Sequence, residues 1–467
     1  MTFLVKAPAL VVLAAWSLAL TFLGRGLPPG AVVAAALLAP VGLLLLGSDG
    51  FEGWAFRPAL LVLLLSLGGA VLFLHRLAEP SLPPRYEGEV TVLSERPWGK
   101  RRLVVVEGGG LRLAAFVPPR QVVGAGSHLD VEGEVLPLRK AREGESFDFS
   151  RWARARGIEG ELRPGRWRLL DGKSGWAWRR ARIEAALLLK LPPLMRGHLL
   201  AAWTGGRDPD LARAHRRWGT SHLLAVSGFH VGLVASAILL FAGPSTVGLV
   251  VASALVWAYV FLAGAPASAV RAALMVQLYL QGRQMGRRGG GVNAVALAGL
   301  ILLAWRPWWF WDVGWRLSMT AVLTLTALPD WGKGTAFLAG PLVWLTTAPV
   351  AAEVFGVVPL AGIVLNLVAL PLFAFLLPLA SLAALPVLAG WRGGAAAARF
   401  GEDLFALWAR AADGAANLLV GEVTFSALIY AAGTFVLFLL LARKVGVGPP
   451  RSLAAALALT LFCATSL

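Results

Sequence analysis

The sequence predicts a polytopic α-helical membrane protein with an inserted small β-barrel soluble domain. The 467 residues are 57% hydrophobic and 15% charged, with a mean hydropathy of +0.70, an apolar share above that of a usual soluble domain. One long polar stretch, residues 79–182, interrupts the apolar runs and carries the patterning of short strands. We therefore expect transmembrane helices in residues 1–78, a barrel in 79–182 and a larger transmembrane domain in 183–467.

The charge balance limits the choice of partners. The chain carries 43 Lys and Arg against 26 Asp and Glu, a formal net charge of +17 at pH 7. This excess favours anionic partners, either lipid head groups or nucleic acid, and charge alone does not choose between them. A single cysteine, Cys463, excludes both a disulfide framework and a cysteine metal site within one chain.

Three apolar runs precede the polar stretch, at residues 8–23, 31–46 and 58–75. A membrane helix needs roughly 20 apolar residues, so each run is a candidate, although the second is short. The first run follows Lys6 as a signal peptide would, but no small-residue cleavage site leads into a soluble chain. We expect it to be retained as a helix.

The polar stretch contains segments that alternate apolar and polar residues, or run β-branched, between turn signals. These segments are EGEVTVLSE, KRRLVVVEG, LRLAAFVPP and HLDVEGEVLPL. About five short antiparallel strands of this kind predict a small barrel that resembles the oligonucleotide-binding fold, which often binds nucleic-acid strands along one face. The fold alone does not establish the ligand.

The segment ESFDFSRWARARGIEG predicts a short helix that Asp148 or Ser150 caps. Basic side chains interleaved with an aromatic one can neutralise phosphates and stack on bases. The alternative is a solvated basic helix that its tryptophan docks onto the barrel. The candidate DNA-binding residues of this helix are Arg151, Trp152, Arg154 and Arg156. The arginines and tryptophans that follow, up to residue 182, would equally suit a membrane interface.

The stretch TSHLLAVSGFHVGLVASAILLFAG, residues 220–243, is long and apolar enough to cross a bilayer, yet it contains His222 and His230. A polar ring in lipid costs free energy, so such residues usually face a bundle interior or a wet cavity. Ser227 and Gly228 lie between the two histidines. Two small residues there either let the backbone of a neighbouring helix approach closely or break the helix. The alternative is two histidines packed within a helical bundle.

Four of the six histidines fall within residues 198–230: His198, His215, His222 and His230. A metal site is conceivable there, but no compact ligand pair such as His-Glu-x-x-His occurs, so we expect no metal and no cofactor. The same window holds a loop with Asp208, where a membrane enzyme could place its chemistry. Pro192 and Pro193 interrupt the preceding residues 183–203, which we expect along the membrane surface.

Further apolar runs predict membrane helices at residues 247–264, 267–281, 292–305, 315–328, 337–350, 425–441 and 453–466. Three ionisable residues lie among them, Arg271, Arg316 and Glu353, and each is a functional-site candidate because charge in a membrane is costly. A structural ion pair of an arginine with Glu353 is the alternative. Asn366 lies in residues 357–386, where three prolines predict a broken helix that lines a cavity. Residues 395–420 predict an amphipathic helix.

Basic loops predict the orientation, since cytoplasmic loops of membrane proteins carry an excess of Lys and Arg. The loop GRQMGRRGGG carries Arg283, Arg287 and Arg288, and the segment LARKVG carries Arg443 and Lys444. We expect both on the cytoplasmic side. Counting helices backwards then places the soluble domain outside, with the tryptophans of RPWWFWDVGWR in a belt at the outer face.

The string HLLAVSGFHVGL is similar to the signature of the ComEC competence family. RAALM, GWRLSMTAVL and the elements FDF and LNLVALP also match the family's pattern, although Trp315 and Arg316 replace its usual Phe and Gln and Glu353 stands near a customary Gln. The resemblance covers almost the whole chain. It implies a channel in the bacterial inner membrane that passes single-stranded transforming DNA into the cytoplasm. The channel pathway residues would be His222, Ser227, Gly228, His230, Arg271, Arg316, Glu353 and Asn366.

The resemblance also implies partners: membrane lipids, a DNA receptor outside the membrane, a separate nuclease and a cytoplasmic DNA-handling motor. Many family members append a metallo-β-lactamase-like domain, but this sequence contains no His-x-His-x-Asp-His motif. We therefore expect no nuclease activity and no enzyme function in this chain. Two alternatives stay open, a small-solute transporter whose soluble domain is a structural cap, and a membrane enzyme that uses the loop around Asp208.

Overall fold

The structure is a computed structural model that describes residues 7–46, 56–141, 147–243, 245–284, 291–328, 337–444 and 447–464. The chain divides into two units. The larger unit comprises Met1–Ala78, Pro209–Phe375 and Leu407–Leu467, and the smaller one comprises Glu79–Asp208 and Leu376–Ala406. Helices α15 (Ala361–Leu388) and α16 (Gly394–Leu418) therefore contribute to both.

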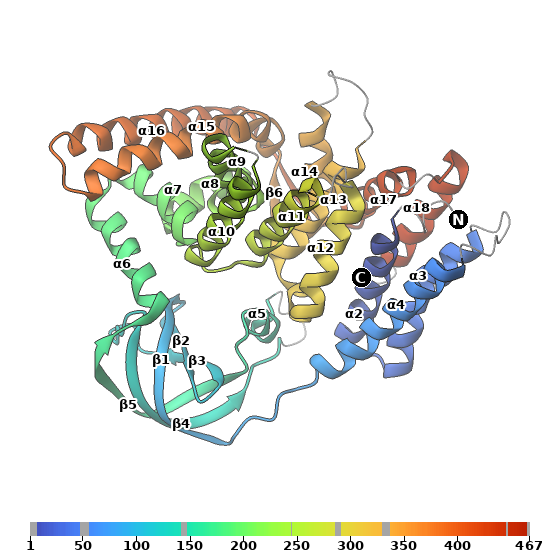
Figure 1. Cartoon of the computed structure of the whole chain (residues 1–467), viewed down its shortest axis with the longest axis horizontal. Helices are drawn as coiled ribbons and strands as arrows, with labels where there is room; N and C mark the ends of the chain where they lie inside the picture. Colours follow the sequence, from blue (N-terminus) through green and yellow to red (C-terminus); the bar gives the residue numbers. More distant parts are fainter. Residues whose placement is uncertain are drawn as a thin grey trace. The chain divides into compact units, whose positions relative to one another are not determined.

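Five strands of the smaller unit close into a barrel in the order β1-β2-β3-β5-β4 (Figure 1). Neighbouring strands are antiparallel, apart from the parallel pair β3 and β5. This confirms the predicted small barrel of about five strands, with one parallel pair that the prediction did not include. The strands are β1 Arg85–Trp98, β2 Arg101–Gly108, β3 Leu111–Val117, β4 Ser127–Pro137 and β5 Gly160–Lys173.

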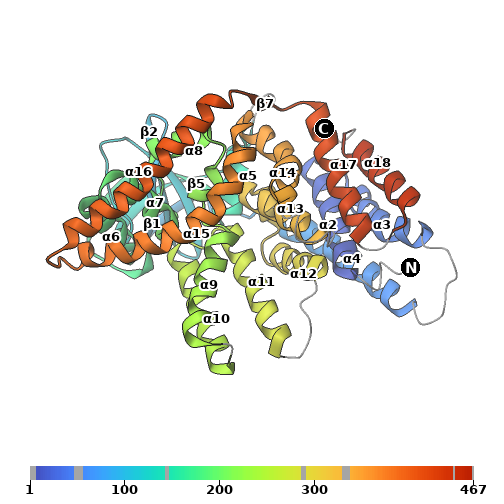
Figure 2. The ribbon, with the colours of Figure 1, turned by 90° about the horizontal axis from the view of Figure 1, so that it is seen from above.

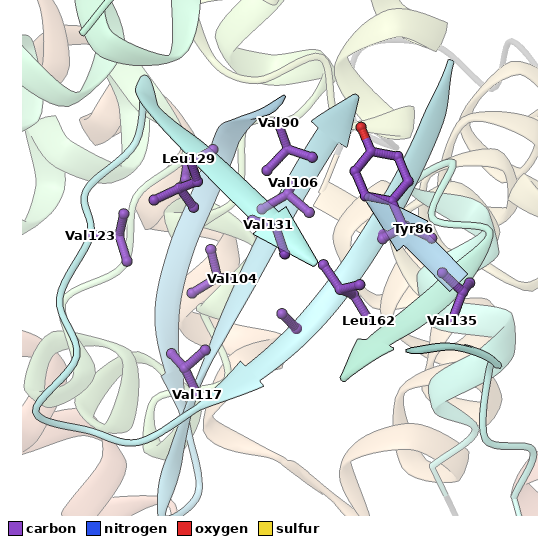
Figure 3. Close-up of a cluster of buried hydrophobic side chains, with 13 residues drawn as sticks. Tyr86, Val90, Val104, Val106, Val117, Val123, Leu129, Val131, Val135 and Leu162 are labelled. Carbon is purple, nitrogen blue, oxygen red and sulfur yellow. The ribbon is translucent and has the colours of Figure 1, made fainter. Parts of the chain in front are cut away.

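The barrel has its own hydrophobic core. Along β4, buried and partly exposed side chains alternate from Ser127 to Gly133, as a strand with one face inward requires. Leu129, Val131 and Leu162 point inward beside Val104 and Val106 (Figure 3). Fully burying a side chain of this size contributes about 1.5–3 kcal/mol. The thirteen buried residues of this cluster therefore give the barrel substantial stability of its own.

A short helix, α5 (Phe149–Ala155), packs on the other face of β2 and β3. Asp148, and not Ser150, caps it: the Asp148 Oδ1 accepts the Arg151 N–H at 3.1 Å, and the Ser150 hydroxyl donates to the same oxygen. Gly157 follows the helix with φ +73°, a left-handed conformation that glycine adopts without strain. Phe149 packs against a second buried cluster around Leu103.

The smaller unit also contains α6 (Gly175–Lys190) and α7 (Pro193–Thr204), which confirms that prolines interrupt residues 183–203. The α15–α16 hairpin anchors α7. Glu402 on α16 accepts the N–H groups of Leu194 and Met195 at 3.1 and 2.8 Å, and so satisfies donors that the first turn of α7 leaves free. The Trp203 indole also donates to the Ser381 hydroxyl at 3.1 Å.

Predicted helices at both ends of the chain are present in the larger unit (Figure 2). The N-terminal three pack on one another, and the Trp16 indole of α2 donates to the Leu65 carbonyl of α4 at 3.0 Å. A Cβ on Gly69 would lie 2.0 Å from that indole nitrogen, so this contact requires glycine. The terminal helices are α2 Pro8–Gly24, α3 Pro29–Leu46, α4 Phe56–Arg76, α17 Ala427–Lys444 and α18 Pro449–Ala464.

The middle of the larger unit follows the predicted runs closely. It contains α8 Pro209–Arg217, the 3₁₀ turn η2 Ser221–Leu224, α9 Gly228–Ala242, α10 Thr246–Leu262, α11 Ala267–Gln284, α12 Gly291–Trp305, the 3₁₀ turn η3 Pro307–Trp311, α13 Val313–Ala327 and α14 Ala339–Phe355. A two-stranded antiparallel ribbon pairs β6 Val357–Pro359, just before α15, with β7 Glu422–Thr424, which follows α16. Figure 2 shows α9 and α10 alongside α11, and the Leu249 cluster packs between these helices.

One sequence-based expectation is wrong. The proline-containing residues 357–386 do not form a broken helix, because α15 is one continuous helix of 28 residues. Pro371, Pro378 and Pro386 stand seven or eight residues apart, so each removes one backbone hydrogen bond and leaves intact turns on both sides. Residues 220–243 do contain a break at Ser227 and Gly228, one of the two predicted roles of this pair, since α9 begins only at Gly228 and has 15 residues.

Two helices in the described residues are long and apolar enough to cross a membrane, α15 and α17. Shorter apolar helices include α2, α9, α10, α12 and α14. Large apolar side chains project from several of these helices, among them Leu240 and Phe241, which are 80% and 89% exposed. The full set of predicted spans and the orientation stay predictions, and Arg287 and Arg288 of the basic loop lie outside the described residues.

Candidate functional site

The break between η2 and α9 shapes the candidate site in the larger unit. Ser227 is extended at φ −125°, and its N–H donates to the His230 Nδ1 at 3.4 Å, with the Ser227 hydroxyl 3.3 Å from the same nitrogen. In the neutral ring the proton then lies on Nε2. That atom is buried and has no hydrogen-bond partner among the residues that the structure describes. The sequence thus places a capping serine and its histidine three residues apart, at the start of the helix.

Arg271 of α11 lies against this helix start. Its side chain is only 2% exposed, and the point where a Cβ on Gly228 would lie is 3.2 Å from its Nη2. Its Nε donates to the Ser318 hydroxyl of α13 at 2.9 Å, and its Nη1 to the Met275 sulfur at 2.8 Å. No carboxylate of a described residue lies within 4.0 Å of the guanidinium. Three helices, α9, α11 and α13, therefore converge on a buried positive charge.

Sequence reasoning missed Ser318, although it belongs to the motif GWRLSMTAVL that drew attention to Arg316. Arg316 instead pairs with Glu353 of α14 through two hydrogen bonds of 3.1 and 2.7 Å. The pair is partly exposed, with side-chain exposures of 30% and 41%. The structure therefore contains the ion pair that the sequence analysis kept as the alternative. Glu353 is not within salt-bridge distance of Arg271.

Two further pathway candidates lie outside the hydrogen bonds of Arg271. His222 lies on the η2 turn with an exposed side chain, close enough to His230 for the two rings to interact electrostatically. Asn366 of α15 donates to the Gly219 carbonyl at 3.4 Å, and within the described part of the chain its own Oδ1 is buried without a partner. A Cβ on Gly219 would lie 2.8 Å from the Cα of Gly362, so the backbones meet closely there.

His198 and His215 each make contacts of their own. His215 is buried against Trp218 and shares a hydrogen bond of 2.9 Å with the Thr220 hydroxyl, while His198 belongs to the smaller unit. Among the described residues no three His, Cys, Asp or Glu side chains come together in a way that could hold a metal ion. Asp208 lies 3.9 Å from the Arg196 guanidinium.

The second candidate site is helix α5 of the barrel. Its Trp152 already contacts several side chains of this chain. Trp152 packs on Phe149, and the guanidinium groups of Arg96 and Arg156 each lie 4.2 Å from its ring centroid. Burial, together with the positive charge of Arg156, lowers the pKa of Arg96 to about 10. Arg151 pairs with Asp148 at 3.3 Å. Base stacking on Trp152 would therefore have to displace an arginine.

Sequence reasoning missed Arg96, which lies in β1 and is far from α5 along the chain. Its one sequence signal is its position two residues before Trp98, whose ring it also approaches at 5.0 Å. The roles of all these candidates in DNA handling stay predictions.

Comparison with known proteins assigns the chain to a family. The model of the family described as Competence protein matches residues 199–447, which is more than half of the sequence. The chain belongs to the competence protein family. This confirms the resemblance to a competence family. The matched residues include the break before α9, the Arg271 cluster and the ion pair, and they exclude the barrel.

One relative of this competence-family chain is ComE operon protein 3 of Bacillus subtilis (strain 168), which is 32% identical over 142 residues. The match covers 29% of this chain and 18% of the relative. The chain thus matches less than a fifth of the relative's length. No solved structure matches the chain significantly.

Proposed function

We propose that this competence-family chain is an inner-membrane channel that passes single-stranded transforming DNA into the cytoplasm. The observation that carries the proposal is an arrangement within the larger unit. Polar groups, including Arg271 and His230, are buried where helices meet, and large apolar side chains such as Phe241 are exposed on the same helices. A channel in a lipid bilayer needs polar groups in its interior and apolar groups on the surface that faces hydrocarbon.

The barrel supports the proposal from a second direction. A five-stranded closed barrel is the architecture of the oligonucleotide-binding fold, which binds single strands through basic grooves and aromatic side chains. We propose that it lies outside the membrane and receives the strand. A receptor outside, a separate nuclease and a cytoplasmic motor complete the proposed system. The proposal assigns no catalytic step to this chain, and cleavage of single-stranded DNA by the purified protein with Mg²⁺ or Mn²⁺ would contradict that part.

A transformation assay in a deletion strain tests the channel. Variants His222→Phe, His230→Phe and Arg271→Met should complement at least about tenfold less well than the wild-type chain, equivalent to about 1.4 kcal/mol on a limiting step. Protein levels in the membrane should stay near normal, because each substitution keeps much of the side-chain volume. Wild-type uptake in all three variants would refute a pathway through these residues. Loss of the proteins from the membrane would instead assign them to the stability of the bundle.

A second measurement separates the channel from a small-solute transporter. A fragment of residues 79–182 contains the barrel and its core, and we expect it to bind oligothymidylate with an affinity that falls as salt rises. A transporter whose barrel is only a structural cap predicts no such binding.

A further inference from the structure

A groove opens in the smaller unit where the end of α6 meets the turn between α15 and α16 (Figure 1). Its volume is about 620 Å³, a size typical of sites that hold small molecules. The end of α6 contributes Leu189 and Leu191 to the lining, and the end of α15 with the turn after it contributes Val387 and Trp391. The groove shares no residue with the barrel strands or with the Arg271 cluster.

The groove lies at the end of a candidate membrane span. Helix α15 is one of the two described helices that are long and apolar enough to cross a bilayer, and it ends at Leu388. Leu379, Leu382 and Leu385 are exposed, and their spacing of three residues places them on one face of this helix, which leads to the groove. Trp391 is also exposed, and tryptophans of membrane proteins gather at the level of the lipid head groups. The end of α15 therefore places the groove at that level.

Charged side chains of both signs line the groove as well. Lys190 donates to the Leu388 carbonyl at 2.8 Å, which leaves two of its three N–H groups for other acceptors. Arg399 of α16 is exposed and forms no ion pair within the described residues. Both carboxylate oxygens of Glu402 accept amides of α7, so the lining carboxylate left for a ligand is that of Asp403.

This lining matches a ligand that combines an apolar part with a negative and a positive charge. A phosphate group accepts hydrogen bonds from lysine and arginine side chains, and a primary ammonium group donates to a carboxylate. A phospholipid with an amine beside its phosphate carries both groups above its acyl chains. An anionic lipid without an amine would bring a second negative charge to Asp403, and a quaternary ammonium has no N–H to donate to it.

We propose that the groove binds one molecule of phosphatidylethanolamine. Lys190 and Arg399 bind its phosphate, Asp403 binds its ammonium group, and its acyl chains lie along the exposed apolar face of α15. The proposal rests on the membrane location within the proposed function and is independent of the passage of DNA.

The test uses the full-length protein in detergent. Phosphatidylethanolamine, phosphatidylcholine and phosphatidylglycerol are titrated separately while thermal unfolding is followed, because a ligand that binds the folded state raises the unfolding temperature. Ala395→Trp fills the groove and keeps every charge of the chain. Ala396→Trp is the matched control, since Ala396 is the next residue of α16, is exposed and does not line the groove.

We expect the wild-type protein and Ala396→Trp to bind phosphatidylethanolamine equally, and Ala395→Trp to bind it at least tenfold more weakly. Equal affinity in the two tryptophan variants would overturn the site. If Ala395→Trp does not fold, Arg399→Gln makes the same comparison with Arg392→Gln, an exposed arginine outside the groove lining. Equal affinity in these two arginine variants would then overturn the site.

A further variant, Asp403→Asn, tests the identity of the lipid. The wild-type protein should prefer phosphatidylethanolamine to both other lipids, and Asp403→Asn should lose its preference over phosphatidylcholine. Stronger binding of phosphatidylglycerol by the wild type, or an unchanged preference in Asp403→Asn, would overturn the assignment. None of these measurements involves DNA, so the lipid site and the channel function can fail separately: a negative transformation result leaves the lipid site standing.

Discussion

Acid should destabilise the smaller unit through His198. This residue of α7, a helix that is not a candidate span, is 2% exposed, and its ring stacks on Phe405 with centroids 4.0 Å apart. Its Nδ1–H donates to the Leu194 carbonyl at 2.7 Å. Burial lowers the pKa of His198 from 6.5 to about 4, and the Leu194 hydrogen bond and the charge of Asp208 only partly oppose this effect.

The sign and size of the effect follow from linkage between folding and protonation. In the unfolded chain His198 takes up a proton below pH 6.5, whereas the folded ring does so only near pH 4. The neutral buried ring therefore stabilises the fold fully above pH 6.5, and this contribution is lost as the pH falls towards 4. A difference of 2.5 pKa units at 1.36 kcal/mol each amounts to about 3 kcal/mol, most of which is lost by pH 4.5.

The assay is thermal unfolding in detergent, followed by tryptophan fluorescence at pH 7.5 and 4.5. His198→Phe keeps an aromatic ring against Phe405 and cannot titrate, so its loss of stability on acidification should be smaller than that of the wild-type protein by about 2 to 3 kcal/mol. His75→Phe replaces an exposed histidine of the larger unit and should keep the wild-type response. An identical acid response in His198→Phe and wild type would refute the reasoning.

Three other predictions concern the barrel, the orientation and the ion pair. Replacing the three α5 arginines of the 79–182 fragment with Ala should flatten the salt dependence of single-strand binding by about 0.7 log units per lost phosphate contact; an unchanged slope with an intact fold would leave α5 a solvated helix. These arginines are Arg151, Arg154 and Arg156. In a chain without its native cysteine, a cysteine at Lys100, an exposed position in the turn between β1 and β2, should react with an impermeant reagent in spheroplasts and one at Gly290 should not; the reverse would invert the direction of transport. Reversing the charge of Arg316 or Glu353 alone should lower the unfolding temperature, and reversing both should restore part of it, with a coupling energy of order 1 kcal/mol from a double-mutant cycle.

Local pattern was enough to predict many of the elements of this fold. Strand alternation in β4 and the apolar runs that became α2 and α10 depend on neighbours within a few residues, so composition and period reveal them. The cap at Asp148 and the break at Ser227 and Gly228 are equally local, because a cap is a contact across one turn. The family signature could be recognised for the same reason, as it is a continuous string.

Contacts between distant residues could be decided only by the tertiary structure. The sequence left open whether an arginine pairs with Glu353 and which arginine that would be, and the packing of α13 against α14 brings Arg316 to it. The sequence left Trp152 as either a base-stacking ring or the residue that docks α5 onto the barrel, and only the structure shows that Arg96 reaches it from another strand. Glu402 caps a helix more than two hundred residues earlier in the chain.

The Arg271 cluster shows why this difference arises. The sequence indicated separately that the charge of Arg271 is costly in a membrane and that Gly228 allows a close approach of the backbone. It could not show that the Arg271 guanidinium lies against the start of α9 beside Ser318. The cost of a buried charge depends on which groups surround it in space, and α9, α11 and α13 supply those groups from different parts of the chain. Periodicity therefore determined where the helices lie, and packing alone decided which of their polar residues share a site.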